Sequence, residues 1–130
     1  VMAASKPTMT VYRSPTCGCC EKWVANMRQH GFKVEDIVSN EMDAIKAQRG
    51  IPKNLRSCHT AVVGQHVIEG HVPAQDIEAL LKGPASPYGI SVPGMPSGTP
   101  GMEMGGRKDP YDIVGFEKSG TSKVLRHVTD

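Results

Sequence analysis

Three cysteines fall within four positions, in the run Cys17-Gly18-Cys19-Cys20, and the fourth cysteine, Cys58, stands alone. A structural disulfide framework would spread its cysteines so that each bond closes a loop between distant segments. Neighbouring Cys19 and Cys20 are poorly placed for that purpose. The packing of these thiols therefore predicts chemistry, either on a metal ion or by thiol exchange.

Cys17 and Cys20 form a C-x-x-C pair at the start of a predicted helix. Backbone N–H groups and the helix dipole favour a thiolate there and lower its pKa below about 8.5. Such a thiolate serves either as a metal ligand or as the nucleophile of disulfide exchange. Cys19 favours the metal, because a third thiol would scramble a redox disulfide, whereas extra soft sulfurs can bridge several cuprous ions. Thiol redox alone and a structural zinc or iron–sulfur site remain open.

A further thiol and an imidazole are expected to face this run. Ser57-Cys58-His59-Thr60 precedes a predicted strand, at the position where a thioredoxin-like fold normally carries a cis-proline beside its C-x-x-C motif. Cys58 and His59 would then approach the cysteines at close range. The alternatives are that Cys58 is a small buried apolar residue and that His59 is a hydrogen-bonded polar one.

Other soft or borderline donors lie later in the chain. Met95, Met102 and Met104 fall in a stretch rich in proline and glycine, where they have no core to fill, and thioether sulfur selects Cu(I). The alternative is a loop packed by its own methionines. His71, in Glu-Gly-His-Val-Pro, is a candidate ligand, against a solvent-facing or capping role. The other histidines are expected at the surface: His30, His66 and His127.

Elements of alternating type are expected to position these residues. Strand patterns fall at 9–13, 32–38, 60–64 and 66–69. Helical patterns fall at about 19–30, 40–49 (with Asn40 as N-cap) and 73–83. The order β-α-β-α-β-β-α predicts an α/β fold with a thioredoxin-like or glutaredoxin-like core, whose first two strands pair in parallel. We assign residues 8–83 to this domain.

Residues 84–130 are predicted to form a C-terminal extension of different character. Between Pro84 and Pro110 the chain has six prolines and six glycines and almost no periodic apolar pattern. This stretch is far longer than the roughly 4–6 residues of a usual connection, so it is either disordered or functional. Residues 111–117 and 123–128 are then predicted to form a closing β-hairpin. We expect this Pro/Gly/Met-rich extension to pack on the same domain and to help bind metal.

Composition narrows the possible function. The chain of 130 residues is 38% hydrophobic, and 15 basic against 13 acidic residues give a net charge of +2. No basic stripe with interleaved aromatic residues is present, which argues against nucleic acid as a partner. No apolar run approaches the roughly 20 residues of a membrane span. Residues 1–6 lack a signal-peptide pattern, which suits a cytosolic protein or a secreted one after processing.

Four motifs, in this order, resemble the CopG-type copper-resistance proteins of Gram-negative bacteria. They are the C-x-C-C run after the first strand, Ser-Cys-His-Thr, Glu-Gly-His-Val-Pro, and Pro-Gly-Met-Pro followed by Pro-Gly-Met-Glu. The likeness runs from about Thr10 to the C-terminus. It implies a thioredoxin-like domain with a metal-binding extension, a multinuclear copper cluster bridged by cysteine sulfur, and a periplasmic location. It also implies a copper oxidoreductase that interconverts Cu(I) and Cu(II) to aid detoxification and export.

Carried over by motif, the metal ligands are four thiolates and two thioethers: Cys17, Cys19, Cys20, Cys58, Met95 and Met102. His59 and His71 are candidates for a further ligand, and the resemblance does not decide between them. The expected partners are copper ions and a copper efflux system or periplasmic copper carrier, with the protein itself a monomer. Two other functions remain open: a metal-independent thiol–disulfide oxidoreductase, with Cys17 as nucleophile and Cys20 resolving, and a non-catalytic copper chaperone or storage protein.

Overall fold

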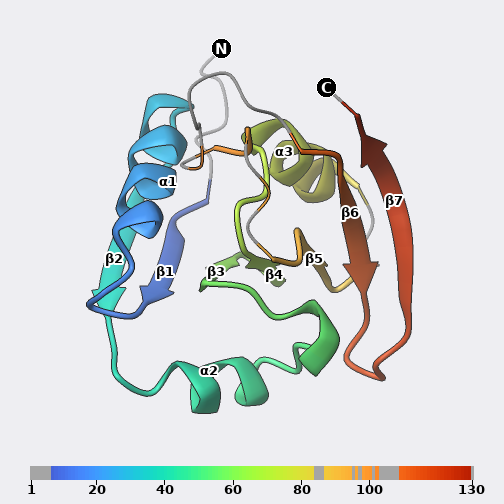
Figure 1. Ribbon diagram of the computed structural model, residues 1–130, viewed down its shortest axis with the longest axis horizontal. Coiled ribbons are helices and arrows are strands. Elements are labelled where there is room, and N and C mark those ends of the chain that lie inside the picture. Colours follow the sequence, from blue (N-terminus) through green and yellow to red (C-terminus); the bar gives the residue numbers. More distant parts are fainter. Residues whose placement is uncertain are drawn as a thin grey trace.

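A computed structural model of the chain describes residues 7–83, 87–94, 96, 98–100, 102 and 109–129. Among these residues, one mixed sheet contains seven strands in the order β2-β1-β3-β4-β5-β6-β7 (Figure 1). The strands are β1 (Met9–Arg13), β2 (Val34–Val38), β3 (His59–Val63), β4 (His66–Glu69), β5 (Gly89–Ser91), β6 (Tyr111–Phe116) and β7 (Ser122–Val128). The helices are α1 (Gly18–Gln29), α2 (Met42–Gln48) and α3 (Ala74–Lys82), with a 3₁₀ turn at Lys53–Leu55. In the described part of the chain, no helix has the length and apolar character needed to cross a membrane.

The order of elements from β1 to α3 is the predicted β-α-β-α-β-β-α. Strands β1 and β2 pair in parallel, as expected for a right-handed crossover through α1. Strand β1 also pairs antiparallel with β3, and β3 pairs antiparallel with β4. The end of β1 therefore lies beside the beginning of β3, and this arrangement decides where the cysteines meet.

Helix α1 presents one apolar stripe to the sheet. Its buried residues are Cys20, Trp23, Val24 and Met27, at the i, i+3, i+4 and i+7 spacing of one helix face. The Trp23 indole N–H donates to the carbonyl of Val72 at 3.0 Å. This bond ties α1 to the segment that precedes α3 and so fixes the helix that carries the cysteine motif.

Both faces of the sheet are covered. One apolar cluster joins α1 and α3 to the sheet and includes Trp23, Ile68 and Ile77. A second cluster includes Leu55 and Val67. Because adjacent residues of a strand point to opposite faces, the division between Val67 and Ile68 of β4 places the two clusters on opposite sides. In Figure 1, α2 lies on the other side of the sheet from α3.

The C-terminal residues extend the same sheet. Strand β5, which the sequence pattern did not predict, pairs in parallel with β4 and antiparallel with β6. The predicted hairpin is present as β6 and β7. At Gly89 an added Cβ would meet the Phe116 ring and would lie 2.8 Å from the Val67 carbonyl oxygen. The close pairing of β5 therefore requires glycine at this position.

Two local expectations are wrong. Asn40 does not cap α2, because the N-cap position falls on Glu41, whose amide donates to the Ser39 hydroxyl at 3.0 Å. His66 is 7% exposed, since its position in β4 brings Nδ1 to 3.1 Å from the Tyr88 carbonyl oxygen. The other two histidines expected at the surface are exposed: His30 and His127.

Candidate metal centre

The C-x-C-C run lies at the N-terminus of α1, shortly after β1. Cys17 is the N-cap, with extended backbone (φ −91°, ψ 90°), and the helix begins at Gly18. Cys17 and Cys19 are half-buried, whereas Cys20 is fully buried on the apolar face of α1. The amides of the first turn and the positive end of the helix dipole favour negative charge at this end of α1.

Cys58 reaches this run because β3 lies next to β1. The sulfur atoms of Cys17, Cys19, Cys20 and Cys58 all lie within 4.8 Å of one another. Cys17 and Cys20 form a disulfide with their Cα atoms 5.5 Å apart, and the sulfurs of Cys17 and Cys19 are 3.4 Å apart. All four cysteines of the chain therefore belong to one site.

Two buried histidines adjoin Cys58. The Cys58 sulfur and the ring nitrogens of His59 and His71 form a second group of potential ligand atoms within 4.8 Å of one another. The His59 ring contacts two other rings: its centroid lies 4.4 Å from that of Trp23 and 5.0 Å from that of His71. His59 Nδ1 lies 3.2 Å from the Cys58 sulfur. Cys58 therefore links the thiols to the imidazoles.

A hydrogen bond selects the tautomer of His71. Its Nδ1 lies 2.5 Å from the carbonyl oxygen of Pro100, which can only accept, so Nδ1 carries the proton. In the neutral ring the lone pair then resides on Nε2, the atom that would meet a metal ion. Metal-binding histidines usually donate their second ring N–H to a carbonyl, a carboxylate or water in this way.

Burial controls the protonation of Cys58 and His59. It raises the pKa of the Cys58 thiol to about 12, with a further increase from neighbouring Cys19 and an opposing effect of Lys46. Burial also lowers the pKa of His59 well below its usual value, and His71 and Lys46 lower it further. His59 is therefore neutral at pH 7, as a ligand must be, whereas Cys58 must release a proton to bind a metal ion.

Residues of the extension contact the site through backbone carbonyls. The Ser57 hydroxyl donates to the carbonyl of Gly94 at 2.6 Å, and the carbonyl of Pro100 accepts the hydrogen bond from His71 Nδ1. Met102, two residues after Pro100, is half-buried. Met95 lies outside the described residues, and so does Met104. The structure thus brings together the cysteines and histidines predicted for the site and leaves the role of the methionines a prediction.

A buried ion pair near Cys58 was not predicted from the sequence. Lys46 of α2 and Glu69 of β4 pair with each other and are only 4% and 0% exposed. No pattern distinguishes Lys46 from a solvent-facing lysine of a surface helix. Glu69 offered a weak signal, as a charged residue at the end of a predicted strand.

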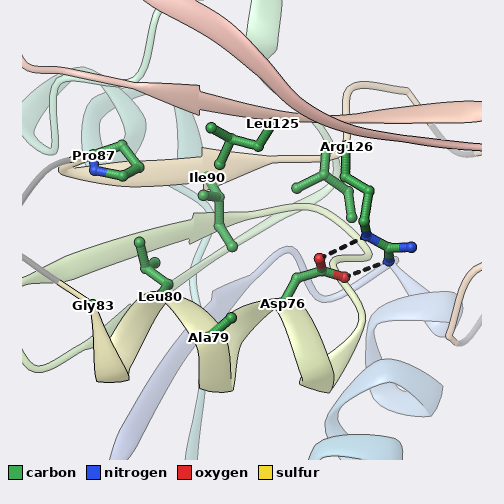
Figure 2. Close-up of a pocket in the computed structure, with 9 residues that line it drawn as sticks. Asp76, Ala79, Leu80, Gly83, Pro87, Ile90, Leu125 and Arg126 are labelled. Atoms are coloured by element: carbon green, nitrogen blue, oxygen red, sulfur yellow. Dashed lines mark hydrogen bonds and ion pairs between the residues drawn. The ribbon is translucent and has the colours of Figure 1, made fainter.

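The groove shown in Figure 2 is separate from the cysteines. It lies between α3 and the C-terminal strands and is lined by apolar residues that include Leu80, Ile90 and Leu125. The ion pair between Asp76 and Arg126 lies at its edge. None of the described residues that line it is a cysteine or a histidine. The groove therefore contributes no ligand to the candidate metal centre.

The donor set at the cysteines fits soft metal ions. Thiolates select Cu(I), zinc and iron–sulfur clusters, and imidazole suits copper and zinc. A structural zinc ion takes four ligands in a closed tetrahedral site. Here the four cysteine sulfurs form one group of potential ligands, and Cys58 also belongs to a second group with the buried His59 and His71. Together these residues offer more donor atoms than one structural zinc ion uses. The arrangement therefore suits more than one metal ion, or one ion with alternative ligands.

Together the fold and the site define a mixed α/β protein with a cysteine-rich site suited to soft metals. Two solved structures, named copper resistance protein CopG form 1 and form 2, are both 44% identical to the chain, with TM-scores of 0.91 and 0.90. The matches cover 96% and 95% of this chain and 99% and 98% of theirs. Residues 55–102 match a family described as a protein of unknown function, DUF411. No curated protein matches at a significant level. The chain belongs to the CopG family of copper-resistance proteins, as its motifs predicted.

Proposed function

We propose that the protein binds copper at its cysteine cluster and interconverts Cu(I) and Cu(II) as part of copper resistance. The observation that carries the proposal is the gathering of four cysteine sulfurs within 4.8 Å of one another, with two buried histidines beside them. The similarity to structures named copper resistance protein CopG supports copper as the metal.

The thiolates are proposed as the bridging ligands. Soft sulfur can bind more than one soft ion, so four adjacent thiolates favour a multinuclear copper cluster. Loading the site requires reduction of the disulfide between Cys17 and Cys20, because only thiolates are strong ligands. The proposed ligands, from the helix start, the strand entry and the extension, are Cys17, Cys19, Cys20, Cys58, His59, His71, Met95 and Met102.

The mixture of donors supports a change in copper valence. Thiolate and thioether favour Cu(I), whereas imidazole also suits Cu(II), so both states have ligands within one site. Each Cu(I) that becomes Cu(II) loses one electron to an external one-electron carrier, and the reverse step takes one back. Copper that stays bound during this change is kept from free solution until it is exported.

We also infer that residues 8–83 are a thioredoxin-like domain and that residues 84–130 are a metal-binding extension packed on it. The strand order β2-β1-β3-β4, with the cysteine motif at the start of α1, supports the first inference. The hydrogen bonds from Ser57 and His71 to carbonyls of the extension support the second.

The proposed setting is the periplasm of a Gram-negative bacterium, and the proposed form is a monomer. The family resemblance supports both, along with delivery of copper to an efflux system or a periplasmic copper carrier. Release of the tagged protein by osmotic shock checks the location. Sedimentation of the metal-free and copper-loaded protein checks the oligomeric state, and a dimer in either state would contradict the proposed monomer.

A metal-independent thiol–disulfide oxidoreductase is the second candidate, and one observation favours it. Cys17 and Cys20 are bonded in the structure, with Cys17 half-buried and Cys20 fully buried. This arrangement suits an accessible attacking thiol and a protected resolving thiol. It leaves Cys19 and Cys58 without a role, and for that reason we favour copper.

Copper loading of the reduced protein without oxygen tests the proposal. We expect at least one tightly held copper ion per chain after gel filtration, and a visible or near-infrared spectrum that changes on oxidation. Less than one copper ion per chain would contradict the metal site. Copper that binds but keeps one valence in an anaerobic redox titration would indicate a chaperone or storage protein.

A further inference from the structure

A buried ion pair contacts the segment that carries Cys58 and His59. Its partners, Lys46 and Glu69, are 4% and 0% exposed. Burying two charges is costly, and replacing such a pair by apolar residues of similar size often leaves stability unchanged or improves it. Stability alone is therefore a weak explanation for this pair. Its hydrogen bonds indicate a more specific role.

The Glu69 carboxylate accepts hydrogen bonds from both ends of the segment 57–60. Its Oε2 accepts from the Ser57 amide at 2.7 Å, and its Oε1 accepts from the Thr60 hydroxyl at 2.6 Å. Lys46 donates to the same carboxylate and to the Thr60 hydroxyl, the latter at 3.0 Å. Ser57 and Thr60 flank the cysteine and the histidine of the candidate metal centre. One carboxylate therefore anchors the segment on both sides of these two residues.

The neighbouring backbone leaves little freedom around this anchor. Thr60 and Glu69 are register partners in β3 and β4. Gly70 has φ of 81°, and its amide donates to the His59 carbonyl at 3.0 Å. A Cβ at Gly70 would lie 2.8 Å from the Ser57 Cβ. Residues 57–60 contain no proline that could restrict the backbone conformation of this segment. The hydrogen bonds to Glu69 restrict it instead.

We propose that Glu69, held in place by Lys46, is a positioning residue of the metal centre that fixes the Cys58 sulfur against the C-x-C-C run. The inference rests on the proposed copper function and adds a role for two residues outside the ligand set. Loss of the carboxylate frees the Ser57 amide and the Thr60 hydroxyl. The Cys58 sulfur then shifts relative to the other thiols while the sheet stays intact.

Two double variants separate this role from a simple effect of charge. In Lys46→Met/Glu69→Leu, the leucine double variant, apolar residues replace the pair and the Ser57 amide loses its acceptor. In Lys46→Met/Glu69→Gln, the glutamine double variant, both charges are also removed, but the side-chain amide oxygen still accepts from Ser57 and its NH₂ donates to Thr60. Single variants are avoided because they leave an unpaired buried charge.

Cu(I) affinity of the reduced protein, measured by competition with a chromophoric Cu(I) chelator, is the first readout. We expect a loss of about tenfold or more in the leucine double variant, as is typical when outer-shell partners are removed, and of about threefold or less in the glutamine double variant. The matched control Asp76→Leu/Arg126→Met removes an ion pair between α3 and β7. This pair lines a groove whose described residues include no cysteine or histidine, so the control should keep the wild-type affinity. Wild-type affinity in the leucine double variant, or an equal loss in both, would overturn the inference.

Unfolding midpoints and circular dichroism show which variants are folded. If the leucine double variant does not fold, Thr60→Val provides a milder test, because it removes one of the two anchors and nearly preserves side-chain volume. We expect it to weaken Cu(I) binding by about threefold, while the Cu(I)-induced thiolate absorption band also shifts. An unchanged affinity and band would overturn the inference.

A metal-free readout separates this inference from the proposed function. With Cys17 and Cys20 bonded, glutathione disulfide can oxidise the thiols of Cys19 and Cys58 to a second disulfide and leave as two glutathione thiols. Peptide mass spectrometry follows the rate of this closure, which requires the two sulfurs to meet. We expect slower closure in the leucine double variant even if the wild-type protein binds no copper, which would contradict only the proposed function. Equal closure rates would overturn the inference whether or not copper binds.

Discussion

The cysteines of this site come from two segments, the start of α1 and the residue before β3. The two candidate functions assign different roles to these cysteines. In the proposed copper centre Cys58 would be a ligand, whereas in a disulfide exchange enzyme only Cys17 and Cys20 would act. Cys58→Ser should therefore weaken copper binding by about tenfold or more and leave thiol–disulfide turnover unchanged. Copper per chain and dithiol turnover are measured on the same samples. A variant with normal copper content would contradict the assignment of Cys58.

Cys17→Ser provides the matched comparison for that experiment. The copper proposal expects this variant to lose copper affinity as Cys58→Ser does, because both sulfurs belong to one group. The oxidoreductase alternative expects strong loss of turnover in Cys17→Ser alone. The pair of variants therefore distinguishes the functions whichever activity the wild-type protein shows.

His59 makes the metal-free protein sensitive to acid. Its ring is buried beside His71 and Lys46, which lowers the folded-state pKa well below the usual value. The unfolded chain takes up a proton near pH 6.5 that the folded chain does not, so stability falls as the pH decreases through about 6.5. Each further pH unit should cost about 1.4 kcal/mol until the folded pKa is reached.

Urea unfolding of the metal-free protein at a series of pH values measures this loss of stability. His59→Phe should remove the contribution of His59 to the slope, because the variant has no imidazole at that position to protonate. His30→Gln, at an exposed position, should keep the wild-type slope. If His59→Phe also keeps it, another buried group causes the acid sensitivity.

At the scale of elements, β5 connects the N-terminal strands to the C-terminal hairpin. Gly89→Ala would place a Cβ against the Phe116 ring and 2.8 Å from the Val67 carbonyl oxygen. We expect a loss of about 2 kcal/mol in the free energy of unfolding, because β5 must move away from its partners. Gly18→Ala is the control, since a Cβ there meets no atom within 4 Å. Equal stability of the two variants would show that β5 tolerates the shift.

The elements differ in how far local sequence predicts them. Helices α1 and α3 bury an apolar stripe as their patterns predict, whereas α2 buries only Lys46 and β4 is buried throughout. The sequence therefore predicts the order of these elements better than it predicts their burial. Strand β5 has only three residues, all buried, and too few positions to show a period. Its pairing with β4 and β6 depends on the surrounding sheet. The cap of α2 was missed for a similar reason, because Ser39, Asn40 and Glu41 are all plausible near a helix start.

At the scale of the whole molecule, the extension contributes to the central core. Ile90, Val92 and Ile113 belong to the same apolar cluster as Trp23 and Ile77. Truncation after residue 83 would expose this cluster and leave β4 as an open sheet edge. We expect the full chain to unfold in one transition and the truncated chain to lose cooperative unfolding, as followed by calorimetry and circular dichroism. A truncated chain that unfolds cooperatively would contradict this prediction.

The sequence by itself determined the family, the element order and the gathering of the cysteines. The C-x-C-C run was predicted at a helix start after a strand, and the likeness to a thioredoxin-like fold predicted that Cys58 would face it. Both candidate histidines of the sequence, His59 and His71, lie beside Cys58, and their roles as ligands remain predictions.

Only the tertiary structure decided which polar groups are buried and what they contact. Lys46 pairs with Glu69, and His71 donates a hydrogen bond to the Pro100 carbonyl, so both interactions join residues that are distant in the chain. The burial of His66 has no signal in the local sequence pattern. Periodicity reports which face of an element is apolar, but a buried polar side chain is satisfied by partners that other elements supply. The positions of the four sulfurs follow from the strand order, whereas the network that holds Cys58 against them arises only when α2, β3 and β4 pack together.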